Sequence, residues 1–90
     1  MAYPNPKQPK QYFDDIVAEY FKAEDKHPGW PSEDITFAVS ILNEEAGKLT
    51  RIVNDVRAGR LTVDEARPDL RRYAARVGAM GLRFVEGLEQ

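Results

Sequence analysis

The sequence contains no cysteine among its 90 residues, so it can form neither disulfide bonds nor a metal site built from thiolates. It also lacks a long apolar run. The uncharged stretch at residues 35–43 is too short to cross a bilayer, which takes a helix of about 20 apolar residues. No basic and apolar export signal opens the chain. With 31% charged residues and a mean hydropathy of -0.56, the sequence predicts a cytoplasmic protein without a membrane segment.

The alternation of apolar and polar residues that is typical of β-strands is also absent, and we therefore expect an all-α fold. Apolar residues recur instead at helical spacing in three segments, at about residues 10–25, 33–58 and 67–88. Residues 1–9 hold three prolines and no apolar periodicity, so they are predicted to form a flexible N-terminal arm. Residues 10–90 then make a single helical domain.

The predicted helix boundaries follow from residues that stop or start a helix. Residues 26–31, which include two prolines and a glycine, are expected to end the first helix. Ser32 is a good N-cap for the second helix. Gly59 is expected to end the second helix. Residues 62–65, Thr-Val-Asp-Glu, have the spacing of a capping box, and we expect them to open a short turn of helix before Pro68.

Three helices with wide apolar stripes enclose only a thin core in a chain of this length. The second and third helices should form an antiparallel hairpin with an exposed apolar edge. Two such hairpins, packed together, complete a four-helix bundle. The expected architecture is therefore an N-terminal helix plus an antiparallel helical hairpin that assembles as a homodimer or a higher homo-oligomer.

The formal net charge of -2 hides an uneven distribution of charge along the chain. Residues 1–47 carry 4 lysines and arginines against 9 acidic residues, whereas residues 48–83 carry 9 against 4. Eight of those nine basic residues are arginines, whose planar guanidinium suits phosphate. The back half therefore favours an anionic partner, with a solvated helix face as the simpler interpretation. Overall acidity and the absence of a recognisable nucleic-acid module argue against DNA or RNA.

The most informative stretch is Glu44-Glu45-Ala46-Gly47-Lys48, which lies inside the expected second helix. Two adjacent glutamates place at least one carboxylate near the apolar face of a helix, where a carboxylate needs a cation as partner. Lys48 lies one turn away from both, at i+4 and i+3, and can pair with either. Whether the cation is this basic side chain or a divalent metal decides between a binding protein and an enzyme.

Two blocks of the sequence resemble a known family. The first contains Lys-His-Pro-Gly-Trp-Pro at 26–31, Asp34 and Ile-Leu-Asn-Glu-Glu-Ala-Gly at 41–47, and the second is Gly-Ala-Met-Gly-Leu-Arg-Phe at 78–84. Over roughly residues 12–88 the chain is similar to the MazG-like all-α nucleoside triphosphate pyrophosphohydrolases, most of all to small phage and bacterial members. The resemblance implies oligomers of helical hairpins that cleave nucleotides between the α and β phosphates, with Mg²⁺ held by acidic residues of two helices.

The sequence departs from the acidic pattern of that family. The family carries Glu-Glu-x-x-Glu on one helix and Glu-x-x-Asp on the next. Glu44 and Glu45 match the first two positions, but Lys48 takes the third, and the second motif falls on Tyr73 and Arg76. Because Mg²⁺ takes oxygen ligands in near-octahedral geometry, these departures predict a protein with no catalytic residue, no metal site and no cofactor.

The same substitutions predict a different kind of site. Cations that stand where a metal once bridged protein and phosphate would bind a nucleotide directly, without Mg²⁺ and without turnover. We therefore expect a catalytically silent relative that sequesters or senses a nucleotide or a nucleotide-derived signal; if a phage encodes it, it would act in the host cytoplasm as an anti-defence protein. The expected ligand-binding residues are Lys26, Trp30, Glu44, Glu45, Lys48, Tyr73 and Arg76.

Individual roles follow from the chemistry of these side chains. Arg76 would face Lys48 from the third helix and either hold the second carboxylate or grip a phosphate. Lys26 would contact phosphate, and the Tyr73 hydroxyl would hydrogen-bond the ligand from the edge of the site. Trp30 offers a stacking surface for a base, or it packs as a hydrophobic staple at the start of the second helix.

Three alternatives stay open at this stage. An active Mg²⁺-dependent pyrophosphohydrolase would use Glu44 and Glu45 as metal ligands and take further carboxylates from a neighbouring subunit, with Asp34, Asp69 and Glu86 as candidates. A helical bundle that binds another protein would use the exposed apolar edge of the hairpin. The charged residues of the expected site could also form an interhelical ion-pair network that holds no ligand.

Overall fold

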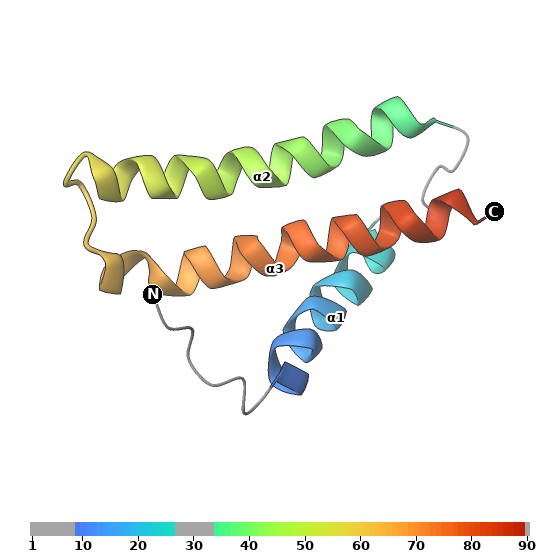
Figure 1. The fold of residues 1–90 in the computed structure, drawn as a ribbon, viewed down its shortest axis with the longest axis horizontal. Helices are drawn as coiled ribbons and strands as arrows, with labels where there is room; N and C mark the ends of the chain where they lie inside the picture. Colours follow the sequence, from blue (N-terminus) through green and yellow to red (C-terminus); the bar gives the residue numbers. More distant parts are fainter. Residues whose placement is uncertain (1–8, 27–33, 90) are drawn as a thin grey trace.

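The computed structural model describes residues 9–26 and 34–89, and within these ranges it contains three helices and no strand (Figure 1). The helices are α1 (Pro9–Lys26), α2 (Ile35–Arg57) and α3 (Val63–Leu88). The expected all-α fold is therefore confirmed. None of the three helices is long and apolar enough to cross a membrane. The arm expected at residues 1–9 lies outside the described residues, apart from Pro9.

The helices are arranged around α3. α2 runs antiparallel to α3 along its length, whereas α1 crosses α3 at an oblique angle (Figure 1). Both α1 and α2 pack on α3, and in the part of the chain that the structure describes their backbones do not pack on each other. The predicted antiparallel hairpin is present, and α3 holds the other two helices together.

The start of α2 lies two residues later than predicted. Asp34 is its N-cap, because the Asp34 carboxylate accepts a hydrogen bond from the backbone N–H of Phe37 at 2.9 Å. A carboxylate suits this position, since the helix dipole favours negative charge at an N-terminus. Ser32, the cap expected from the sequence, lies outside the described residues.

The end of α2 is the predicted one. Ala58 is the C-cap, and Gly59 follows with φ of +79°, in the left-handed region that favours glycine. The Gly59 N–H donates to the Val56 carbonyl at 3.0 Å, which satisfies one of the carbonyls left open at the helix end. This turn allows the chain to reverse direction into α3.

The capping box at Thr62 is confirmed, but the helix that it starts is longer than predicted. The Thr62 side chain accepts from the Glu65 N–H at 3.1 Å, and the Glu65 carboxylate accepts from the Thr62 N–H at 2.9 Å. We expected a short turn followed by a separate helix, whereas α3 runs without a break through Pro68. Pro68 lies in the second turn of α3, where its missing N–H removes one backbone hydrogen bond. The helix continues because the capping box and the packing of the fully buried Ala66 stabilise its first turns.

The core is small and lies where all three helices meet. Its buried members are Ala38 of α2 and Ala79 and Met80 of α3. The partly buried side chains packed around them are Ile16, Tyr20, Ala23, Ile41, Leu42 and Phe84. Met80 and Phe84 both belong to this core, and the core of one copy is as thin as the sequence indicated.

Much apolar surface of the described residues remains exposed in this single copy. On α1, Phe13, Val17 and Phe21 recur every four residues, and Phe13 and Phe21 are more than half exposed, at 64% and 61%. On α3, Val85 and Leu88 are also more than half exposed. Side chains of this kind, repeated along one helix face, are typical of surfaces that another chain covers.

Candidate functional site

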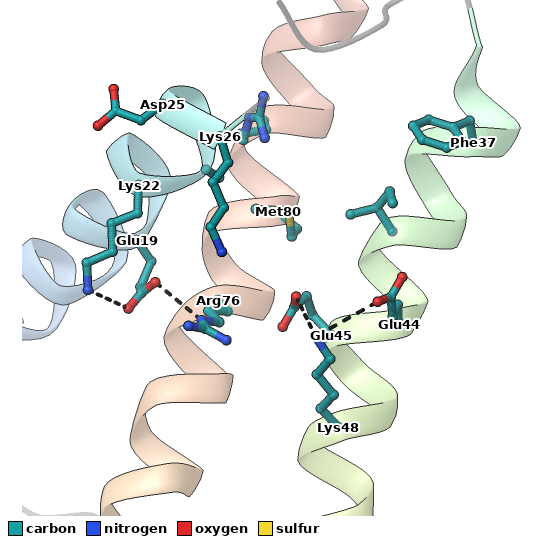
Figure 2. Close-up of a pocket in the computed structure, with 13 residues that line it drawn as sticks. Glu19, Lys22, Asp25, Lys26, Phe37, Glu44, Glu45, Lys48, Arg76 and Met80 are labelled. Carbon is teal, nitrogen blue, oxygen red and sulfur yellow. Dashed lines mark hydrogen bonds and ion pairs between the residues drawn. The ribbon is translucent and has the colours of Figure 1, made fainter. Parts of the chain in front are cut away.

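A cavity of about 790 Å³ lies between α1 and α2, over residues 76–83 of α3 (Figure 2). This volume is within the range of ligand pockets, which is about 300–1,000 Å³. The side chains around it are the cations Lys22, Lys26, Lys48, Arg76 and Arg83, the carboxylates Glu19, Asp25, Glu44 and Glu45, and the apolar Ala23, Phe37, Ile41 and Met80. Five of the seven predicted site residues are therefore gathered in one cavity.

The predicted pairing of Lys48 with both glutamates is confirmed. The Lys48 ammonium lies 3.4 Å from Glu45 Oε1 and 3.9 Å from Glu44 Oε1 (Figure 2). The two carboxylates differ in burial, because the Glu44 side chain is 63% exposed and that of Glu45 only 17%. Glu45 Oε2 is fully buried and has no hydrogen-bond partner among the described residues. A buried acceptor without a donor is costly, so Glu45 can take one further donor.

Arg76 lines the cavity as predicted, but its carboxylate partner is Glu19 of α1, and neither Glu44 nor Glu45. Its Nε lies 3.4 Å from Glu19 Oε2. The other oxygen of Glu19 pairs with Lys22 at 3.3 Å, one turn along α1. In Figure 2 these two contacts occupy one wall of the cavity, and the Lys48 contacts occupy the opposite wall. The cavity thus separates two ion-paired groups.

The pair of Glu19 and Arg76 belongs to a row of ion pairs that sequence reasoning missed. The row consists of Asp15 with Arg71, Glu19 with Arg76, and Glu24 with Arg83. Every carboxylate of the row is on α1 and every arginine is on α3. Residues 71–83, which include the positions where the second acidic motif of the family is missing, contain no carboxylate, and this stretch of α3 is therefore the cationic complement of an acidic α1.

Tyr73 does not line the cavity. Its ring lies beside two guanidinium groups, 5.1 Å from that of Arg72 and 5.2 Å from that of Arg76, measured to the ring centroid. Cations stack favourably on the faces of aromatic rings at such distances. Tyr73 therefore lies outside the cavity lining and contacts Arg76, which does line the cavity. This position does not support the hydrogen bond that we predicted from the Tyr73 hydroxyl to a ligand.

Two further predicted residues and one unpredicted residue complete the site. Lys26, the last residue of α1, points into the cavity (Figure 2). Trp30 lies outside the described residues. Phe37 of α2 lines the cavity and is 51% exposed, so it presents a free aromatic surface. The signal for Phe37 in the sequence is its place in the helical pattern, one residue before the buried Ala38.

The carboxylates considered as metal ligands do not form one cluster. Glu44 and Glu45 both contact Lys48, and no group of three or more acidic or histidine side chains in the described ranges could hold a metal ion. The three carboxylates considered for a neighbouring copy have other partners: Asp34 caps α2, Asp69 pairs with Arg72, and Glu86 accepts from Tyr20. These donors do not fit the oxygen shell that Mg²⁺ prefers.

No protein-family model, no curated protein and no solved structure matches this chain. The fold is established as a small all-α protein in which α1 and α2 pack on α3. The family resemblance depends on the sequence blocks alone. The function is therefore argued from the geometry of the cavity.

Proposed function

We propose that the protein binds a nucleotide or a nucleotide-derived signalling molecule in the cavity between α1 and α2, without metal and without turnover. One observation carries the proposal: each of the three helices contributes a cation to the same cavity. They are Lys26 of α1, Lys48 of α2 and Arg76 of α3. Ammonium and guanidinium groups that converge from separate elements are the usual means of holding a phosphate.

The lining as a whole suits a phosphorylated ligand with an aromatic base. Its five cations outnumber its four carboxylates, although the chain as a whole is acidic. Ile41 and Met80 supply an apolar surface, and the half-exposed Phe37 supplies an aromatic ring on which a base can stack. The Glu44 carboxylate, which lines the cavity and is 63% exposed, can accept a hydrogen bond from the amino group of a base or a ribose hydroxyl.

The proposed biological role is to sequester or to sense this ligand. A protein that resembles MazG-like pyrophosphohydrolases but carries Lys48, Tyr73 and Arg76 in place of their carboxylates would keep the ligand pocket and lose the metal. If a phage encodes it, removal of a nucleotide signal from the host cytoplasm would silence the defence that depends on that signal. Binding without hydrolysis is sufficient for such a role.

The alternative of an active pyrophosphohydrolase is less well supported. Lys48 lies within 4 Å of both remaining carboxylates, and its positive charge would have to be displaced before Mg²⁺ could bind there. Hydrolysis would also need carboxylates from another copy, and those considered already have partners. We keep this alternative as an outcome of the experiment described below.

We further propose that the protein acts as a homodimer or a higher homo-oligomer. The supporting observation is the exposed apolar surface of the described helices, above all Phe13, Val17 and Phe21 on α1. The hairpin of α2 and α3 would complete a four-helix bundle with a second hairpin. A different protein that covers this surface is the competing explanation, and it predicts a monomer in isolation.

The test is a calorimetric titration of the intact protein with a panel of nucleoside triphosphates, cyclic dinucleotides and ADP-ribose derivatives, in EDTA and again in Mg²⁺, with the ligand analysed afterwards. Tight binding in EDTA with the ligand recovered intact would support the proposal. Cleavage that depends on Mg²⁺ would instead establish a hydrolase, and no binding in either buffer would favour a protein-interaction bundle.

Two variants and a control assign the binding to this cavity. Lys48→Glu and Arg76→Glu should each weaken binding by about tenfold or more, because a charged hydrogen bond contributes about 1.5–3 kcal/mol. Arg51→Glu is the matched control, since Arg51 is an exposed residue of α2 that does not line the cavity. Equal affinity in all three variants would contradict the proposed site.

A further inference from the structure

Glu19 is a carboxylate in the wall of a cavity that we assign to an anionic ligand. Its side chain is only 11% exposed, and its two oxygens contact Arg76 of α3 and Lys22 of α1. It thus neutralises two of the five cations around the cavity. A ligand phosphate that approaches Arg76 meets a negative charge that already holds this guanidinium.

The contact between Glu19 and Arg76 is weaker than the neighbouring pair of the same row. Arg71 holds Asp15 with two nitrogens, at 2.6 and 2.9 Å, whereas Arg76 reaches Glu19 with Nε alone, at 3.4 Å. The terminal nitrogens of Arg76 make no hydrogen bond to any described residue, and its guanidinium also lies against the Tyr73 ring. The Tyr73 ring therefore helps to orient the Arg76 guanidinium, whereas Glu19 holds it by a single long contact.

We propose that Glu19 is an internal competitor for the ligand phosphate at Arg76, so that α1 regulates the affinity of the site. The inference rests on the proposed function and adds a regulatory element to it. A phosphate binds a guanidinium through two parallel N–H donors, which is a better geometry than the single Nε contact of Glu19. Ligand binding at Arg76 would then displace Glu19 and remove one of the ion pairs that connect α1 to α3.

The experiment compares two neutral variants that keep the shape of the side chain. Glu19→Gln removes the competing charge and keeps an oxygen that can accept from Arg76. Asp15→Asn removes the charge of the next pair, which lies outside the cavity. The probes are inorganic pyrophosphate and the nucleotide panel, titrated in EDTA into the intact protein, with thermal unfolding measured for both variants.

We expect Glu19→Gln to bind the anionic probes about three- to tenfold more tightly than the original protein, because one negative charge leaves the wall of a partly desolvated cavity. Asp15→Asn should bind them with unchanged affinity. An unchanged or weaker affinity of Glu19→Gln would overturn the inference, since Glu19 would then position Arg76. An equal gain in both variants would overturn it too, since a general loosening of α1 would explain the gain.

The failure of the inference can be told apart from the failure of the proposed function. If the original protein binds a nucleotide and Glu19→Gln binds it no better, only the competitor role of Glu19 is wrong. If neither protein binds any probe, the nucleotide site itself is wrong and the inference falls with it. Binding that is detectable only in Glu19→Gln would support both.

Discussion

The hydroxyl of Tyr20 donates a hydrogen bond to Glu86 Oε2 at 2.5 Å, which joins α1 to the last turns of α3 across 66 positions of sequence. This bond raises the pKa of Tyr20 from 10.0 to about 12, because ionisation of the phenol would bring a second negative charge next to the Glu86 carboxylate. Unlike the ion pairs of the α1–α3 row, this contact needs a neutral donor on α1.

The first prediction concerns stability at alkaline pH. A raised pKa means that the contribution of Tyr20 to stability is complete below pH 10 and is lost as the pH rises towards 12. In a spectrophotometric titration of the phenols, Tyr20 should therefore ionise at about pH 12, above the ordinary phenol pKa of 10.0. The substitution Glu86→Gln should bring the pKa of Tyr20 back towards the ordinary value of 10.0. If the titration of Glu86→Gln superimposes on that of the original protein, the hydrogen bond does not form in solution.

The second prediction concerns the capping box at the start of α3. The backbone and side-chain hydrogen bonds with Thr62 lower the pKa of Glu65, so its contribution to stability is present above the ordinary value of 4.5 and is lost as the pH falls through the lowered pKa. Thr62→Ala should reduce the free energy of unfolding by about 1 kcal/mol at neutral pH. Urea unfolding at a series of pH values checks both statements. Glu65→Gln is the control, since it keeps the capping geometry and should lack this acid dependence.

The third prediction uses two glycines of α3 that differ in their surroundings. A Cβ at Gly78 would lie 3.2 Å from Ile16 Cδ1, whereas a Cβ at Gly81 would meet nothing within 4 Å. Gly81→Ala should therefore stabilise the protein by about 0.5–1 kcal/mol, and Gly78→Val should destabilise it by about 1–3 kcal/mol because it pushes α1 away. Thermal unfolding measures both. A destabilising Gly81→Ala would indicate that a second chain packs closely at this position.

The fourth prediction tests self-association through α1. Phe21 is 61% exposed and follows Phe13 and Val17 on one face of the helix. Phe21→Glu should shift the mass measured by light scattering from an oligomer towards a monomer, because a charge in an apolar interface is poorly tolerated. Phe37→Glu, at a residue of similar exposure that lines the cavity and lies outside this face of α1, should leave the mass unchanged if the contact between copies is made by α1. A monomeric original protein would contradict the proposed assembly and favour a different partner protein.

The fifth prediction assigns the aromatic contact in the cavity. Phe37→Ala should weaken nucleotide binding by about 1–3 kcal/mol if a base stacks on this ring, and it should leave the binding of inorganic pyrophosphate unchanged. Calorimetry with both ligands separates the two effects. A parallel loss for nucleotide and pyrophosphate would indicate that Phe37 shapes the cavity and does not contact a base.

The helices and the local pairs were predictable because their determinants lie close together in the sequence. The ion pairs of Lys48 with Glu44 and Glu45 follow from spacings of four and three residues on one helix, and the capping box at Thr62 follows from a spacing of three. The end of α2 at Gly59 was predictable for the same reason, since it depends on the conformation of one glycine. In each case one turn of backbone fixes which side chains meet.

The partners across helices were not predictable in the same way. The pairing of Arg76 with Glu19 depends on the angle at which α1 crosses α3, and no local pattern encodes that angle. The exposed ring of Phe37 beside the cavity likewise depends on the space left between α1 and α2. The helix break expected near Pro68 was wrong, because the capping box at Thr62 stabilises the helix by more than the one hydrogen bond that the proline removes.

The contact of α3 with α1 and its contact with α2 differ in how they depend on ionic strength. Three ion pairs, in addition to apolar side chains, attach α1 to α3, whereas α2 is attached by apolar side chains and by no ion pair among the described residues. Added sodium chloride screens the ion pairs, above all the exposed pair of Asp15 and Arg71, and leaves the apolar contacts nearly untouched. Rising ionic strength would therefore loosen the N-terminal helix selectively, and amide hydrogen exchange would accelerate in α1 while the hairpin of α2 and α3 stays protected.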